Sequence, residues 1–126
     1  MYNDYREISD IKGKTFVKVE NSGEGQIRFV CEDGSYYSLE HVQDCCESVW
    51  LDDITGDLSN LEDTEILVAE ERFQEPSYGE DEYTPESSTW TFYTFRTVKG
   101  TVTLRWIGES NGYYSESVSV FYNKVQ

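Results

Sequence analysis

Three glycine-containing turn dipeptides, 33–34, 99–100 and 111–112, constrain the fold of this chain more than any other feature. Asp-Gly, Lys-Gly and Asn-Gly dipeptides suit tight hairpin turns because glycine tolerates positive φ angles. The segments around them are rich in β-branched and aromatic residues, as strands are. Six of these segments are expected to be strands: residues 14–21, 25–32, 35–41, 89–98, 101–108 and 113–122. The sequence therefore predicts two antiparallel meanders of three strands each.

The segment 101–108 shows how such a strand divides its side chains between two faces. Successive strand residues point to opposite faces of a sheet. Leu104 and Trp106 therefore share one face. Arg105 lies on the other face, together with Thr103 and Ile107. We expect Arg105 to be a strand arginine opposite an aromatic face.

The region between the two meanders is expected to be less regular. Residues 43–61 are interpreted as one or two short helical turns, in which the Asp-Cys-Cys-Glu segment 44–47 resembles a capping box and Gly56 ends the helix. Residues 65–73 are predicted to form another strand. The segment 74–88 contains both prolines and many acidic residues without a base, which predicts a mobile, solvated loop. The predicted fold class is mainly β, or α+β, with antiparallel hairpins and one or two short helices.

Length and composition limit the number of domains and the classes of partner that this chain can have. Its 126 residues fit a single β-rich domain, 1–126, and its 37% hydrophobic and 15% aromatic residues can form a core. Its 25 acids and 10 bases give a formal net charge of −15, which repels phosphate backbones and anionic lipids. We therefore expect no nucleic-acid partner and no membrane partner. A small anionic ligand remains compatible with this charge if a pocket gathers arginines.

The lack of recognisable targeting signals and the cysteine pattern indicate a cellular compartment. No apolar run approaches the length of a membrane span, and residues 1–10 lack the basic and apolar regions of a signal peptide. The three cysteines, Cys31, Cys45 and Cys46, form an odd set without framework spacing. This pattern favours free thiols and a reducing cytoplasm.

Catalytic and metal sites were weighed and are not expected. His41 lies four residues before Cys45, but no orienting group or oxyanion motif accompanies this pair. His41 and the three cysteines lack the spacing of a zinc site. The sequence also lacks a glycine-rich phosphate loop, a GxSxG motif and an EF-hand. We therefore predict a binding protein rather than an enzyme, with no metal and no cofactor.

The arginines and aromatic residues of the predicted strands suit a nucleotide ligand. Guanidinium groups bind phosphates through paired hydrogen bonds, and aromatic rings stack on bases. Arg28 and Arg105 lie inside predicted strands, and Trp90 and Phe92 lie in a third. About half or more of the strand aromatics must nevertheless pack in the core, because a sheet buries one face.

Two stretches of the chain resemble a known protein family. The first is 41–49, HVQDCCESV, with the following DITGDL at 53–58. The second begins with TWTFY at 89–93 and continues to SNGYYS at 110–115. They resemble a family of small phage and prophage proteins filed as an uncharacterised domain. That family is similar to the phage Thoeris anti-defence proteins, which act as sponges: they bind glyco-cyclic ADP-ribose, made by bacterial TIR enzymes, without cleaving it.

The resemblance implies a function and an assembly. The protein is expected to sequester a cyclic nucleotide signal, glyco-cyclic ADP-ribose or also a cyclic oligonucleotide, in the cytoplasm of the bacterial host. It is also expected to be a homo-oligomer, a dimer or in some members a hexamer, with ligand between subunits.

Residue type and placement, rather than alignment to that family, select the candidate binding residues. They carry guanidinium, aromatic or amide groups: Arg28, Trp90, Phe92, Arg105, Asn111, Tyr113 and Tyr114. The two arginines are expected to meet the pyrophosphate, and Phe92 or Trp90 to cover the adenine. The three turn residues are expected to contact the ribose or the base.

Two other functional classes stay open at this point. An acidic DNA mimic or protein–protein inhibitor of a host defence complex would follow directly from the net charge of −15. A small phosphodiesterase would require a base or a metal. We rank the sponge first, the inhibitor second and the enzyme third.

Overall fold

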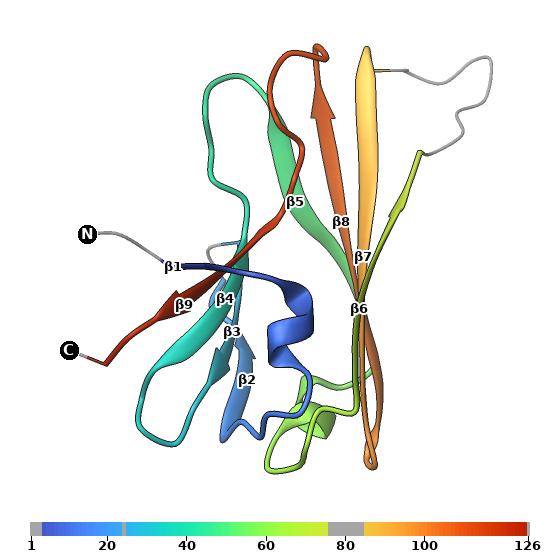
Figure 1. Cartoon of the computed structure of the whole chain (residues 1–126). Coiled ribbons are helices and arrows are strands. Elements are labelled where there is room, and N and C mark those ends of the chain that lie inside the picture. The colour runs from blue at the N-terminus through green and yellow to red at the C-terminus, as the bar shows by residue number, and fades with distance from the viewer. Residues whose placement is uncertain (1–3, 24, 76–84, 126) are drawn as a thin grey trace.

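The chain folds into two antiparallel sheets that pack face to face. This computed structural model describes residues 4–23, 25–75 and 85–125. It is mainly β, with 56% strand and 7% helix. The five-stranded sheet has the order β1 (Asp4–Arg6), β9 (Ser119–Asn123), β4 (Tyr36–Glu40), β3 (Gln26–Val30) and β2 (Lys18–Asn21). The four-stranded sheet has the order β5 (Ser48–Thr55), β8 (Gly100–Ser110), β7 (Ser87–Thr97) and β6 (Val68–Gln74). Figure 1 shows these sheets as two layers, with the β4–β5 and β8–β9 connections passing between them at the same end.

A single core cluster joins the two sheets. Phe29 of β3 packs against Phe95 of β7 with their ring centroids 5.0 Å apart, and both rings are fully buried. Burying a phenylalanine side chain contributes roughly 1.5–3 kcal/mol to folding. The predicted alternation in β8 is confirmed: Leu104 and Trp106 are buried, whereas Arg105 lies on the outer face.

Most of the predicted strands are confirmed, with shifted ends. The first meander consists of β2, β3 and β4, as expected. Gly34 has a φ of 92°, so the Asp-Gly turn uses the conformation that only glycine adopts freely. In the β7–β8 hairpin, Thr97 pairs with Gly100, which makes 98–99 the two-residue loop instead of 99–100.

The helical interpretation of residues 43–61 is wrong for most of that range. Residues Ser48–Thr55 form β5, which pairs with β8, and the helical part is the 3-10 helix η2 (Leu58–Leu61). A β-bulge between Leu51 and Asp53 interrupts the alternation of the strand. Because this extra residue breaks the period-two pattern, the sequence does not look like a continuous strand.

The second predicted meander also differs from the structure. The chain turns after β8, where Gly112 has a φ of 91°, but the returning segment does not pair with β8. It crosses to the other sheet, and β9 begins only at Ser119 and pairs with β4 and β1. Gly108 makes room for this crossing, because a Cβ atom there would lie 2.7 Å from Cβ of Glu116.

The 3-10 helix η1 and the predicted acidic loop are the remaining elements. Helix η1 (Ile8–Ile11) follows β1 and packs beside β6. Strand β6 extends to Gln74 and β7 begins at Ser87, so the predicted loop 74–88 is shorter at both ends. Most of it, residues 76–84, lies outside the described residues.

Candidate functional site

The outer face of the four-stranded sheet brings three of the predicted binding residues together. Phe92 of β7 pairs directly with Arg105 of β8, and Trp90 lies one outward position further along β7. The guanidinium carbon of Arg105 lies 5.1 Å from the ring centroid of Trp90. The rings of Trp90 and Phe92 are 6.3 Å apart. Each cation–π contact of this kind contributes about 0.5–1 kcal/mol at an exposed site.

Two residues that sequence reasoning missed extend this group. Arg72 of β6 pairs with Phe92 and places its guanidinium carbon 4.6 Å from the Phe92 ring centroid. Trp50 of β5 pairs with Ile107, which in turn pairs with Trp90, and its side chain is exposed. Arg72 could have been found from the sequence, because it lies in the strand predicted at 65–73. Strand alternation places its side chain on the face opposite Phe73. The helical interpretation concealed Trp50.

We call these five residues the arginine–aromatic face: Trp50, Arg72, Trp90, Phe92 and Arg105. A row of paired residues runs across three strands of the face, from Arg72 through Phe92 to Arg105. The outer face of an antiparallel sheet normally carries polar side chains toward water. The partly buried rings of Trp90 and Phe92, with two guanidinium groups beside them and the exposed ring of Trp50, therefore suggest a surface that suits planar, anionic molecules.

An acidic residue already holds one of these arginines. Asp52, the extra residue of the β5 bulge, accepts a hydrogen bond of 2.8 Å from Nε of Arg105 and a second one from Nη2. The pair is partly exposed, so its net contribution to stability is small. Its geometric effect is larger, because Asp52 and Trp90 together fix the orientation of the guanidinium group. A phosphate that binds Arg105 must displace Asp52 or share the guanidinium with it.

Arg28 does not belong to this group. It lies on the outer face of the five-stranded sheet, between the buried residues Ile27 and Phe29 of β3. Its guanidinium carbon lies 4.8 Å from the Tyr36 ring centroid, and Nε donates to Oε1 of Gln26. Since the core separates the two outer faces, Arg28 and Arg105 of one chain cannot contact the same small ligand.

The three predicted turn residues form a separate group in the β8–β9 connection. Oδ1 of Asn111 accepts a 3.0 Å hydrogen bond from the Tyr113 amide, and the rings of Tyr113 and Tyr114 are 5.0 Å apart. A depression of about 260 Å³ next to Asn111 is lined by Glu86 and Glu109 among others. Because its charged groups are carboxylates, this depression does not suit an anionic ligand.

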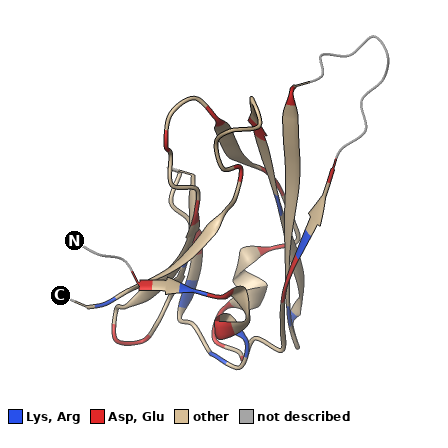
Figure 2. Ribbon diagram, turned by 45° about the horizontal axis from the view of Figure 1, so that its top comes forward, with Lys and Arg blue, Asp and Glu red and all other residues tan. Residues whose placement is uncertain are grey.

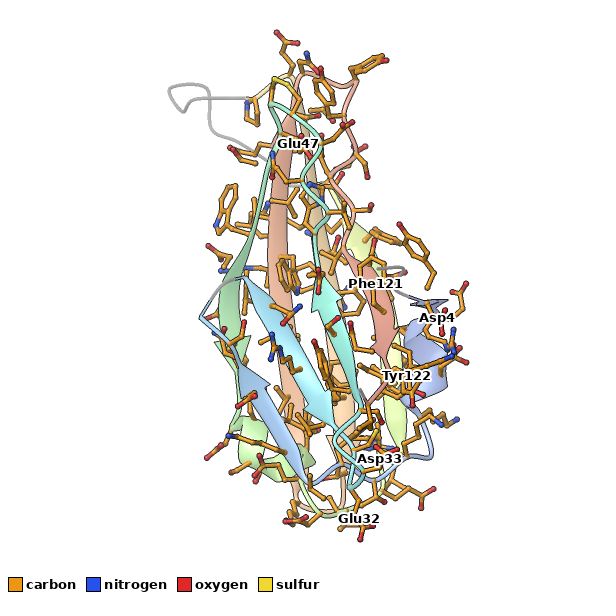
Figure 3. All side chains as sticks on the ribbon, turned by 90° about the vertical axis from the view of Figure 1, so that its left-hand side faces the viewer. Asp4, Glu32, Asp33, Glu47, Phe121 and Tyr122 are labelled. Atoms are coloured by element: carbon orange, nitrogen blue, oxygen red, sulfur yellow. A yellow bond between two sulfur atoms is a disulfide. The ribbon has the colours of Figure 1, made fainter. Side chains whose placement is uncertain are left out.

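His41 connects the two segments that cross between the sheets at this end. Its Nδ1 lies 2.7 Å from the carbonyl oxygen of Ser117 in the β8–β9 connection. Its Nε2 lies 2.6 Å from Oε2 of Glu47 in the β4–β5 connection. The structure thus gives His41 a structural contact with Glu47. Figure 3 shows Glu47 at this end of the molecule and Glu32 and Asp33 at the other.

Glu47 is the centre of the β4–β5 connection. Its buried carboxylate accepts the backbone amides of Asp44 at 2.8 Å and of Cys45 at 2.9 Å. These amides, followed by the hydrogen bond from His41, lower the pKa of Glu47 from 4.5 to about 2. The segment 44–47, predicted as a capping box at the start of a helix, therefore closes a loop through the Glu47 carboxylate and begins no helix.

The cysteines differ from the expectation of free thiols. Cys45 and Cys46 are joined by a disulfide between adjacent residues, whereas Cys31 is free and partly buried. In the described ranges, no three His, Cys, Asp or Glu side chains gather closely enough to hold a metal ion.

A family comparison covers almost all of these elements. Residues 9–120 match the model of a domain of unknown function, DUF7448. The chain belongs to this family. No curated protein and no solved structure matches the chain. The matched range includes the whole arginine–aromatic face and the His41–Glu47 contact, so both are features of the DUF7448 domain of this protein. Among the residues that the structure describes, no helix is long and apolar enough to cross a membrane.

Replacing Glu47 with glutamine is expected to remove an acid-sensitive part of the stability of this DUF7448 protein. A folded-state pKa of about 2 against a usual value of 4.5 means that the carboxylate stabilises the fold above about pH 4.5. That contribution falls as the pH drops toward 2. Urea unfolding should therefore show a large difference between the wild type and Glu47→Gln at pH 7 and a smaller one at pH 3.

The control for this prediction is Glu65→Gln, at an exposed position. It removes the same charge but none of the hydrogen bonds of the Glu47 loop. An equal effect of the two substitutions at pH 7, or a Glu47→Gln effect that does not change with pH, would contradict the role assigned to Glu47.

Proposed function

We propose that this DUF7448 protein is a phage anti-defence sponge that binds a nucleotide immune signal and does not cleave it. The proposed ligand is glyco-cyclic ADP-ribose, and the proposed result is inhibition of Thoeris-type immunity in the cytoplasm of the bacterial host. The observation that supports this proposal is the row Arg72–Phe92–Arg105 with Trp90 beside it. The identity of the ligand follows from the sequence resemblance.

The chemistry of the face agrees with such a ligand. ADP-ribose derivatives combine a purine with a pyrophosphate. An aromatic ring can stack on the purine, and two guanidinium groups on either side of Phe92 can bind the two phosphates. The net charge of −15 repels an anion elsewhere on the surface, which makes the paired arginines necessary.

Binding without catalysis agrees with the groups present. The single histidine of the chain, His41, contacts Glu47 and the Ser117 carbonyl, away from the arginine–aromatic face. A sponge requires tight binding and slow release, and it needs no general base.

A homo-oligomer is part of the proposal. Arg28 and Arg105 lie on opposite outer faces, so both can contact one ligand only if a second copy provides one of them. A dimer, or a hexamer built from dimers, with ligand between subunits would meet this condition. The turn residues Asn111, Tyr113 and Tyr114 would then contact ligand from a neighbouring copy.

The test is recovery of intact ligand. Purified protein is mixed with a panel of cyclic ADP-ribose isomers and cyclic oligonucleotides, free ligand is filtered away, and the protein is denatured by heat. We expect mass spectrometry to identify unmodified glyco-cyclic ADP-ribose in the released fraction. A hydrolysed product would indicate an enzyme instead. Failure to retain any member of the panel would reject the sponge.

A second candidate function rests on the acidic end of the molecule. The two connections between the sheets, residues 41–47 and 111–118, contain the exposed Asp44 and the partly exposed Glu116 but no lysine or arginine. Figure 2 shows red but no blue on these connections. An acidic DNA mimic or protein–protein inhibitor of a host defence complex would use this end. It predicts that Asp44→Asn abolishes inhibition in cells while Arg105→Ala does not.

A further inference from the structure

A second cleft lies at the edge of the sandwich, away from the arginine–aromatic face. Its volume is about 240 Å³, and residues of the edge strand β6, of the chain from β1 into η1, and of β9 line it. The residues around it that carry the argument are Tyr5, Arg6, Glu7, Glu71, Phe73 and Ser119. Glu71 and Arg72 are successive residues of β6, so they point to opposite faces of the sheet. The cleft and the arginine–aromatic face are therefore separate.

A buried tyrosine fixes the carboxylate of Glu71 in this cleft. The hydroxyl of Tyr93 donates a 2.7 Å hydrogen bond to Oε2 of Glu71. The Tyr93 side chain is fully buried, and burial raises the pKa of its phenol well above the usual range. Tyr93 therefore stays protonated and remains a donor. This contact orients the Glu71 carboxylate, and no other side chain or amide of the described residues donates to it, so Oε1 can accept further hydrogen bonds.

The cleft contains carboxylates without a matching cation. Among the described residues, no basic side chain forms an ion pair with Glu71 or Glu7. Arg6 lines the cleft, but its guanidinium lies 3.6 Å from Asp4 and 5.4 Å from the Tyr122 ring centroid. The charge of Arg6 is thus already compensated outside the cleft.

Two exposed rings flank these carboxylates. Tyr5 is 70% exposed and Phe73 is 59% exposed, which is unusual for large aromatic side chains. Aromatic faces and carboxylates together attract guanidinium and ammonium groups through cation–π contacts and charge-assisted hydrogen bonds. A volume of about 240 Å³ is sufficient for one side chain but small for a drug-sized ligand.

The cleft lies beside an edge strand of the four-stranded sheet. Strand β6 pairs with β7, and no strand among the described residues pairs with its other edge. A free edge can add an extended peptide as a further strand, with main-chain hydrogen bonds for affinity and a side-chain pocket for specificity. Inward-pointing charges such as Glu71 also protect an edge strand from pairing with apolar strands. A partner strand must therefore bring a positive charge to Glu71.

We propose that this cleft binds an arginine side chain from an extended segment of a partner protein, which pairs along β6. The guanidinium forms hydrogen bonds with the carboxylate of Glu71 and lies between the rings of Tyr5 and Phe73. The partner is thus a basic protein or a basic tail, attracted by the net charge of −15. This interaction does not depend on the proposed nucleotide site.

The test uses a blocked heptapeptide that alternates threonine and valine around one central arginine. Its control peptide carries citrulline, a neutral isostere, in place of the arginine. NMR titration of the isotope-labelled full chain is expected to shift the amide signals of β6, Tyr5 and Ser119 with the arginine peptide and much less with the citrulline peptide. Glu71→Gln should weaken binding of the arginine peptide about 10-fold or more, because a charged hydrogen bond is lost.

Matched variants separate this site from general attraction to an acidic protein. Glu70→Gln removes the same charge from the adjacent residue on the opposite face of β6, and it should leave affinity unchanged within about twofold. Tyr93→Phe removes only the hydroxyl that orients Glu71 and should weaken binding severalfold while the ring still packs. Equal binding of the two peptides, equal effects of Glu70→Gln and Glu71→Gln, or shifts confined to other surfaces would each overturn the proposal.

Discussion

Arg105→Ala is expected to lower the affinity for glyco-cyclic ADP-ribose about 10- to 100-fold. The substitution removes the charge-assisted hydrogen bonding of Arg105 to phosphate, which contributes about 1.5–3 kcal/mol, and exposes Asp52 as an unpaired negative charge beside the ligand. Both effects act in the same direction. Isothermal titration of purified protein, with the filter-retention assay as a second readout, measures this loss.

Two variants control for the general loss of positive charge. Arg96 lies exposed on the outer face of the same sheet, where it pairs with Val68 and Thr101, and Arg96→Ala should change affinity little. Asp52→Asn keeps Arg105 but removes its competitor, so affinity should rise. Equal losses for Arg96→Ala and Arg105→Ala would show that the arginine–aromatic face is not the ligand site.

Gly56→Ala is expected to destabilise the fold by about 3 kcal/mol or more. Gly56 follows β5 with a φ of 100°, a conformation that costs about 1–3 kcal/mol with a side chain. A Cβ atom there would also lie 2.5 Å from the carbonyl oxygen of Thr101, and such overpacking costs a further 1–3 kcal/mol or so. Urea unfolding followed by tryptophan fluorescence measures the loss.

Gly34→Ala is the matched control, since it separates these two costs. Gly34 has a similar φ of 92°, but no atom lies within 4 Å of the added Cβ. Its substitution should show only the conformational cost. If the two variants lose the same stability, the close approach of β8 to Gly56 does not contribute.

Strands β7 and β8 were predictable because their alternating sequence pattern matches the burial of their two faces. One face of β7 and β8 packs on the core and the other faces water, so apolar and polar positions alternate along both strands. The outward position of Arg105 followed from this alternation alone. The bulge at Asp52 concealed β5, and with it the partner that holds Arg105, because an extra residue shifts the alternation.

The pairing across the hairpin depended on a detail of the turn. A loop at 98–99 places Phe92 opposite Arg105, whereas a loop at 99–100 would have placed Thr94 there. Both dipeptides contain Lys99, and the sequence signal favoured the one with glycine. A shift of one residue in the turn changes the cross-strand partner by two positions and so changes which side chains meet.

The sequence by itself determined the fold class, the first meander and the faces of β8, since each depends on local periodicity and turn chemistry. Only the tertiary structure decided that β9 crosses to the other sheet, that Arg72 joins Phe92 and Arg105, and that Arg28 lies on the opposite face. These outcomes depend on pairing between segments distant along the chain, as when the Ser117 carbonyl contacts His41 and Glu116 packs on Gly108. Such contacts are selected by the packing of two complete sheets, and no short stretch of sequence encodes them.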